Sequence, residues 1–421
     1  MYIMSGYHRL RASLVLLAGS VVLFGLCAQT PLKAQPLEPL NSPIHRLSAE
    51  HCRECHREIY NEWAASMHAK STALYSPIHE AMYRREVGDP RQDGQTTRNG
   101  AFPVCLQCHA PSAAMDGRTK LDALPVYGEG VTCVTCHTMK SYQGIHAHEG
   151  GQMNLGIKAY SFSEVLQGPS GRVFSTRFIP PPPRGIEAIV PTFHPFPMEG
   201  NAALLRSADA CLGCHDQRNN PHGVPLCMTG AEFRQSSTFN CQQCHMPVVD
   251  GRVSHNFYGG YDTAMLRRSV ILTMQAAREQ DSIEVNITLQ NMLPHNMPTG
   301  APFRNAFLRV SAYDSFGILV WANFRQHPLP EDPKAMLMLT LVDEDGKPAP
   351  PPQAKAIGTD TRLQPHESRD FLYQIPAQNV AVVRTELYYD LLLPAMKVMF
   401  DNVPDDLKQA RVIAKSEQRI Y

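Results

Sequence analysis

One motif occurs five times in this chain and limits what the chain can fold into. It consists of two cysteines separated by two residues and followed directly by histidine, and its copies begin at Cys52, Cys105, Cys133, Cys211 and Cys241. With 12 cysteines and 18 histidines in 421 residues, chance would produce only ~0.015 copies. Two thiols three residues apart lie on one side of a helical turn. There they can bond to the two vinyl groups on one edge of a haem, and the histidine can ligate the iron.

The pattern therefore predicts five covalently attached c-type haems. The predicted attachment residues are Cys52, Cys55, Cys105, Cys108, Cys133, Cys136, Cys211, Cys214, Cys241 and Cys244, and the predicted proximal iron ligands are His56, His109, His137, His215 and His245. Disulfides would not need a histidine after every second cysteine. Paired zinc-binding motifs are usually separated by ~15–20 residues, whereas 24 and 26 residues separate the paired motifs here. Cys227, outside the motifs, is expected to be a buried apolar thiol.

The amino-terminal region predicts export. Basic residues precede an apolar run of 13 residues from Leu14 to Leu26, and possible cleavage sites follow after Ala28 and Ala34. This is the layout of a secretory signal peptide, and the run is short for a membrane span. We expect residues 1–34 to be removed and the protein to be periplasmic, extracellular or at the cell surface. An uncleaved terminus that associates with a membrane is the alternative.

The charge balance bears on the partners. The chain has 39 basic and 39 acidic side chains, which disfavours a strongly basic nucleic-acid binder. Without residues 1–34 the numbers become 36 and 39, because Arg9, Arg11 and Lys33 are lost. Five ferric haems with their propionates would bring the net charge to about −8. We therefore expect redox partner proteins with basic docking faces, such as other cytochromes or a quinol-oxidising complex, and no nucleic acid.

The spacing of the last four motifs suggests an internal repeat that identifies second iron ligands. The two motifs of each pair begin 28 or 30 residues apart, and another histidine follows the second motif histidine by nine or ten residues. These two histidines are His146 and His255. The recurrence predicts that both are distal haem ligands, although His148 could replace His146.

Two other histidines are candidates on their position alone. His194 is the only histidine in the proline-rich connection between the pairs, which spans about residues 149–210 and is expected to be extended. His222 could replace it. His68 follows His56 by 12 residues, or about 18 Å along a continuous helix, so it should reach a neighbouring haem rather than its own.

Beyond about Asp262 the haem motifs stop and apolar residues alternate with polar ones. Short alternating strands with glycine-ended turns predict a β-sandwich. The expected fold is thus a mostly helical and irregular multihaem domain at residues 35–262, followed by an all-β sandwich domain at residues 263–421. Within the latter, a proline-bracketed loop at residues 293–300 could hold His295 where it reaches a haem.

At these residues the chain resembles multihaem cytochromes c of the cytochrome c-554 type. The segments that carry the resemblance are Cys52–His56 with Tyr60, Trp63, Ser66, His68 and Ala69, and Cys241–His245 with Met246, Pro247, Ser254 and His255. The loop of His295 with Pro298-Thr299-Gly300 is similar to one found where such domains carry a C-terminal β-sandwich. The resemblance implies closely stacked bis-His haems, with His68, His255 and His295 as distal ligands, and electron transfer in periplasmic or extracellular respiratory chains.

Three functions remain open. The leading one is an electron-transfer protein rather than an enzyme, and a methionine could ligate one of its haems. The second is an oxidoreductase in which one haem lacks a distal ligand and acts on a small nitrogen or sulfur compound, as in hydroxylamine oxidoreductases and pentahaem nitrite reductases. The nitrite reductases mark that haem with a lysine in place of the motif histidine, whereas all five motifs here end in histidine. The third is a haem-wire subunit of a larger assembly or filament.

Overall fold

The computed structural model describes residues 42–146, 153–170, 194, 196–234 and 239–421, all within one compact unit, Pro39–Tyr421. The predicted signal peptide, His148 and the polyproline segment lie outside the described residues. Within the described part, no helix is both long enough and apolar enough to cross a membrane.

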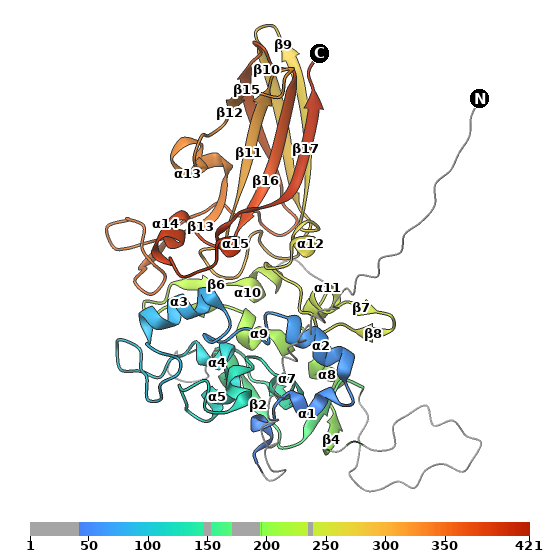
Figure 1. The fold of residues 1–421 in the computed structure, drawn as a ribbon, viewed down its shortest axis with the longest axis vertical. Helices are drawn as coiled ribbons and strands as arrows, with labels where there is room; N and C mark the ends of the chain where they lie inside the picture. Colours follow the sequence, from blue (N-terminus) through green and yellow to red (C-terminus); the bar gives the residue numbers. More distant parts are fainter. Residues whose placement is uncertain (1–41, 147–152, 171–193, 195, 235–238) are drawn as a thin grey trace, which may run out of the picture. The chain divides into compact units, whose positions relative to one another are not determined.

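Short helices and irregular connections make up the part of the chain that carries the cysteine motifs (Figure 1). Its helices are η1 (Ile44–Arg46), α1 (Glu50–Arg53), α2 (Arg57–Ala65), α3 (Pro77–Glu86), α4 (Leu106–His109), α5 (Pro111–Met115), α6 (Pro125–Gly128), α7 (Cys133–His137), η2 (Gly156–Ala159), α8 (Ala202–Leu205), α9 (Asp209–His215), α10 (Thr229–Arg234), α11 (Cys241–His245) and α12 (Thr263–Leu266). The small strand pairs between them are β1 (Met139–Tyr142) with β2 (Tyr160–Phe162), β3 (Leu166–Gly168) with β4 (Met198–Gly200), β5 (Arg218–Asn219) with β6 (Pro225–Cys227), and β7 (Val248–Val249) with β8 (Arg252–Val253).

Two of the motif helices begin at side-chain caps that the sequence encodes. Thr132 caps α7 and exchanges hydrogen bonds with Thr135, and Asn240 caps α11 and exchanges hydrogen bonds with Gln243. Both are capping boxes, which satisfy amide groups that a short helix leaves unpaired. Each box therefore fixes the first cysteine of its motif at the first position of a helix.

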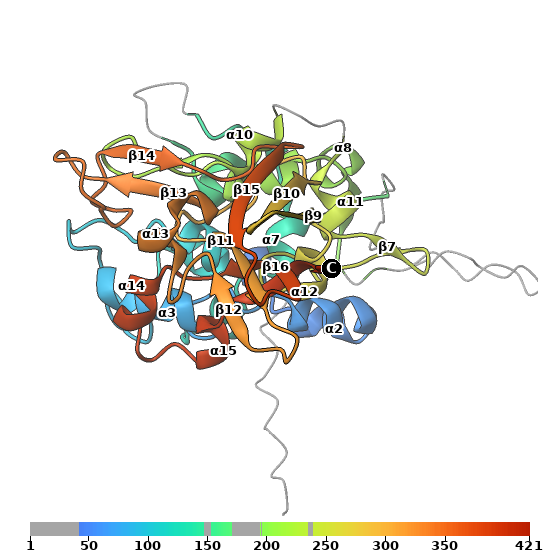
Figure 2. The same cartoon turned by 90° about the horizontal axis from the view of Figure 1, so that it is seen from above.

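The C-terminal part contains two antiparallel sheets (Figure 1). One has the order β15 (Ser368–Pro376), β10 (Ser282–Asn291), β9 (Val270–Glu279). The other has the order β14 (Ala356–Asp360), β13 (Met336–Val342), β11 (Asn305–Tyr313), β16 (Val382–Asp390), β17 (Arg411–Arg419), with β12 (Leu319–Ala322) also paired to β11. The connections contain α13 (Pro328–Glu331), η3 (Pro333–Ala335), α14 (Pro394–Met399) and α15 (Asp405–Lys408). Seen from above, β15, β10 and β9 lie in one row and β11 and β16 in another (Figure 2).

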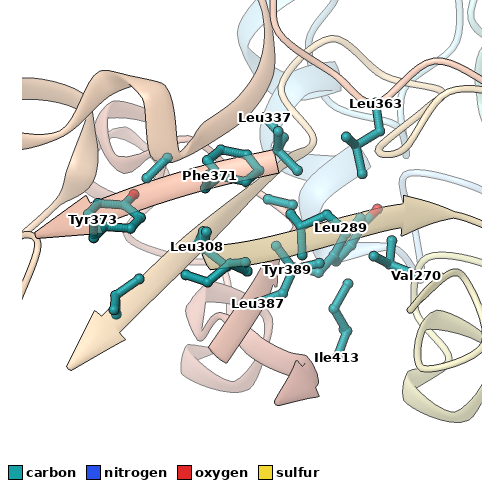
Figure 3. Packing of buried hydrophobic residues seen from close by; sticks show 14 of the residues in the cluster. Val270, Leu289, Leu308, Leu337, Leu363, Phe371, Tyr373, Leu387, Tyr389 and Ile413 are labelled. Atoms are coloured by element: carbon teal, nitrogen blue, oxygen red, sulfur yellow. The ribbon is translucent and has the colours of Figure 1, made fainter. Parts of the chain in front are cut away.

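The largest apolar core lies between these two sheets. Every second residue of β10 from Ile283 to Leu289 is fully buried, and the residues between them are not. From the other sheet, Leu308 and Leu387 belong to the same core (Figure 3). The alternation thus places one face of each sheet against the other, as expected for strands with one buried face. The predicted fold class, a helical and irregular cysteine-bearing region followed by an antiparallel β region, is confirmed.

Candidate functional site

All five motifs line one cavity of about 3980 Å³, and every motif cysteine and motif histidine is on its wall. We number the motif sites 1 to 5 in chain order. The volume corresponds to about 800 Å³ per site, within the ~300–1,000 Å³ that a site for one small molecule or cofactor usually occupies. All eleven cysteines in the described part are free thiols, so the ten motif thiols are available for thioether bonds. The cavity and its donor set therefore fit five covalently attached haems.

Three of the motif histidines are oriented by backbone carbonyls. The Nδ1 atom of His109 lies 3.0 Å from the Ser71 carbonyl oxygen, and that of His137 lies 2.9 Å from the Gln167 oxygen. The His245 Nδ1 atom contacts the Tyr258 carbonyl oxygen at 2.5 Å. A carbonyl only accepts, so Nδ1 must carry the proton and donate. This leaves Nε2 of each ring as the metal-binding atom, as is usual for histidine ligands with an outer hydrogen bond.

Three of the predicted distal ligands lie beside a motif histidine at the spacing that one iron between two imidazoles requires. Rings bound on opposite sides of one ion, each with a metal–nitrogen distance of about 2 Å, have centroids roughly 6.3 Å apart. The observed centroid separations are 6.4 Å for His56 and His194 at site 1, 6.1 Å for His215 and His68 at site 4, and 6.4 Å for His245 and His295 at site 5.

The rings predicted as distal ligands at sites 1, 3 and 5 also lie against backbone carbonyls. The Nδ1 atoms of His194, His255 and His295 lie 2.7, 3.0 and 3.0 Å from the carbonyl oxygens of Phe196, Val253 and Asn296. At site 3, burial lowers the pKa of His255 and the nearby His137 lowers it further. The structure thus brings His255 to site 3.

Burial keeps these imidazoles in the form that binds metal. It lowers the pKa of His68 to about 3 and that of His79 to about 4. Burial also lowers the pKa of His137, His215 and His295. A neutral imidazole has a free nitrogen lone pair, so these rings are ready to ligate iron at neutral pH.

His68 reaches its site by a different backbone route from the predicted one. The helix after the first motif, α2, ends at Ala65, and Ser66 is extended. His68 therefore lies beyond the end of the helix and not on it. Its ring nevertheless lies beside His215 of site 4, a neighbouring site, as its distance from His56 along the chain suggested.

Site 2 has a different arrangement, which sequence reasoning missed. The ring of His79, on α3, contacts the ring of His109 with centroids 4.2 Å apart. Both rings direct Nδ1 to the Ser71 carbonyl oxygen, at 2.8 and 3.0 Å, so the two Nδ1 atoms are at most 5.8 Å apart. Rings on opposite sides of one iron would separate them by about 8 Å. No motif or repeat surrounds His79, so the sequence held no signal for it.

Of the remaining predicted candidates, His222 lines the cavity and His146 does not. His146 is exposed, in an isolated bridge with Met153, and its ligand role stays a prediction. The alternative His222 is exposed and its Nδ1 atom lies 3.3 Å from Lys355 Nζ. Cys227, on β6, lines the cavity, and burial raises the pKa of its thiol.

Thiols of different motifs influence one another, which orders the sites. Cys133 lowers the pKa of the Cys52 thiol, so sites 1 and 3 are neighbours. The thiols of Cys108 and Cys214 likewise make sites 2 and 4 neighbours, and those of Cys211 and Cys241 make sites 4 and 5 neighbours. Cys136 of site 3 interacts electrostatically with both cysteines of site 4. The sites therefore follow one another in the order 1, 3, 4, 5, with site 2 attached to site 4.

The two ends of this series are the most open to solvent. Cys55 of site 1 and Cys244 of site 5 are exposed, whereas the other motif cysteines are partly buried. Burial raises the pKa of Cys136, at the interior site 3, to about 11. Haems bound at sites 1 and 5 would consequently be the accessible ones.

Comparison with known proteins identifies similar cytochromes. The family described as cytochrome c554 and c-prime matches residues 51–138. The crystal structure of a penta-heme cytochrome c552 from Thermochromatium tepidum is similar with a TM-score of 0.83 and 47% sequence identity, over 90% of this chain and 100% of that one. A comparison with curated proteins finds no significant match. The identity and coverage are high enough to show common family membership, and the chain is therefore a multihaem c-type cytochrome of the cytochrome c554 family.

Proposed function

We propose that this protein is an exported pentahaem cytochrome that carries electrons between redox proteins in a periplasmic or extracellular respiratory chain. The observation that carries the proposal is the proximity of cysteines of successive sites, because thioether bonds at those atoms would keep neighbouring haems close together. Each bound haem supplies an iron that cycles between Fe(II) and Fe(III) with one electron.

The geometry supports an assignment of residues to four of the centres. His56 with His194, His137 with His255, His215 with His68, and His245 with His295 are the proposed axial pairs at sites 1, 3, 4 and 5. Two protein ligands per iron leave no position for a substrate, which favours electron transfer over catalysis at these sites. The exposed ends at Cys55 and Cys244 are the proposed points where electrons enter and leave.

A second candidate function is supported by site 2. In this structure His79 and His109 both direct Nδ1 to the Ser71 carbonyl oxygen, and their ring centroids are 4.2 Å apart, less than the roughly 6.3 Å that one iron between two imidazoles requires. A haem held by Cys105, Cys108 and His109 would then have an open position, where a small nitrogen or sulfur compound could bind. Site 2 contacts site 4, so electrons could pass between it and the main series.

Spectroscopy of the purified holoprotein separates these functions. Electron paramagnetic resonance (EPR) of the ferric form counts low-spin and high-spin haems, and carbon monoxide added to the ferrous form binds only where a position is open. Five low-spin haems without a carbon monoxide shift would support the electron carrier alone. A high-spin fraction near one fifth that shifts with carbon monoxide would establish the open centre, and nitrite, hydroxylamine and sulfur oxyanions would then be tested as substrates.

A further inference from the structure

A buried ion pair connects α10 to the β region of the chain. Arg362 Nη1 donates to Glu232 Oε1 at 2.7 Å, and the two side chains are 5% and 7% exposed. Arg362 also donates through Nε and Nη2 to Asp360 at 2.8 and 2.7 Å. Removing such charges from water is costly, and a well-packed apolar pair is often at least as stable. The burial of this pair is therefore weak evidence that its main contribution is to stability.

Glu232 also holds the loop that carries His295. Its second oxygen, Oε2, accepts from the Thr299 hydroxyl at 2.6 Å and from the Asn296 amide at 3.2 Å. Asn296 is the residue whose carbonyl receives the proton of His295 Nδ1. The Glu232 carboxylate thus pairs with Arg362 through one oxygen. Through the other oxygen it accepts hydrogen bonds from the loop that supports the His295 ring.

Arg362 is fixed to the same loop through the backbone. The next residue, Leu363, exchanges two hydrogen bonds with Met297, at 2.9 and 3.0 Å. The Asn291 side chain donates to the carbonyls of His295 and Gln364 at 2.9 and 2.8 Å. The loop is therefore held by polar contacts on both sides of His295.

The result is a defined orientation of His295 at site 5. Its ring and that of His245 are inclined by only 20°, against 41° for the pair at site 1 and 34° for the pair at site 4. The angle between two axial imidazole planes controls how the iron d orbitals split, and hence the largest g value in the EPR spectrum. Groups outside the ligand shell that fix ligand orientation also tune the reduction potential.

We infer that Glu232 and Arg362 are positioning residues that set the orientation of His295 as the distal ligand of site 5. The inference rests on the proposed ligation by His295 and extends it, because it gives the β region a part in holding a redox centre. Neither residue touches the iron position, and both act through Asn296, Met297 and Thr299.

The test uses Arg362→Gln in the full-length holoprotein, with Arg384→Gln as the control for loss of an arginine charge. Arg384 forms an exposed ion pair with Glu417 at 2.7 Å, between β16 and β17. We expect Arg362→Gln to shift the largest g value of one low-spin haem upward and to move one midpoint potential, with all five haems still attached. Arg362→Lys should restore part of both values, and Arg384→Gln should leave both unchanged. Should Arg362→Gln fail to fold, Thr299→Val removes one hydrogen bond to Glu232 and should give the same changes with smaller size.

His295→Ala distinguishes failure of the inference from failure of the ligand assignment. It should convert one haem in five to high spin. If it does not, His295 is not the ligand and the proposed axial pair at site 5 is wrong. If it does, while Arg362→Gln and Thr299→Val leave the g values and potentials as in the wild type, the positioning role is overturned and the ligand assignment stands.

Discussion

The indole of Trp63 donates from Nε1 to the carbonyl oxygen of Val131 at 2.8 Å. Trp63 is buried on α2, directly after the first motif, and Val131 precedes Thr132, the residue that caps the helix of the third motif. This hydrogen bond therefore connects sites 1 and 3, which are distant in sequence and adjacent in the proposed electron path.

Replacement of Trp63 by Phe should weaken that connection. A lost buried hydrogen bond costs about 1–3 kcal/mol when it leaves one partner unsatisfied, and the smaller ring adds a cavity. We expect the free energy of unfolding of the ferric holoprotein, measured in guanidinium chloride, to fall by about 2–4 kcal/mol. Trp321→Phe, at the other tryptophan, is the control. If it lowered the free energy of unfolding as much as Trp63→Phe does, the interpretation of the Trp63 hydrogen bond would be contradicted.

Glu62 should stabilise the loop that carries His255. Its carboxylate accepts from Arg252 at 2.9 and 3.0 Å and from the His255 amide at 2.8 Å. Because the pair is partly exposed, Glu62→Gln should cost only about 0.2–1 kcal/mol of stability. It should nevertheless change the potential or EPR signal of one haem, at site 3. Glu417→Gln, at an exposed pair of the β region, should change neither, and a silent Glu62→Gln spectrum would refute the connection.

Asp116 should make stability depend on acidity. Burial alone would raise its pKa, but hydrogen bonds from Arg46, Tyr127 and His45 outweigh it and hold the pKa well below the usual range. A depressed pKa contributes stability that is fully present above about pH 4, where the unfolded chain ionises, and is lost as the pH falls toward the folded pKa. Asp116→Asn should thus lower the free energy of unfolding by about 1.5–3 kcal/mol at pH 7, and the difference should narrow below pH 4.

Chemical denaturation at several pH values measures this difference. Asp345→Asn is the control, since Asp345 pairs with Lys347 on the exposed surface. A gap between wild type and Asp116→Asn that stayed constant from pH 7 to pH 3 would show that the carboxylate charge is not the cause.

The sequence revealed what repeats and alternation can encode. Five motifs gave the cofactor sites, and the period of two around Ile283 gave the sandwich, because both depend on residues close in sequence. The sequence could predict only that His68 reaches some neighbouring site. Its pairing with His215 depends on how distant segments pack. The His68 ring also contacts the ring of Phe257, with centroids 4.2 Å apart, and Phe257 has a backbone φ of +49°. Nothing in the local sequence marks Phe257 for that conformation, and tertiary packing alone imposes it.

The same limit applies to His79, whose role can be tested against that of His68. The His68 ring has the 6.1 Å spacing from His215 that ligation needs. His68→Ala should therefore convert one haem in five from low to high spin and add one carbon monoxide site. His79→Ala should add no high-spin haem and no carbon monoxide site, because His79 and His109 share the Ser71 carbonyl. EPR and optical spectra of both variants, normalised to five haems per chain, measure this difference. If His79→Ala instead gains a high-spin haem, His79 ligates iron in the loaded protein, site 2 is closed, and the electron-carrier function stands without the second.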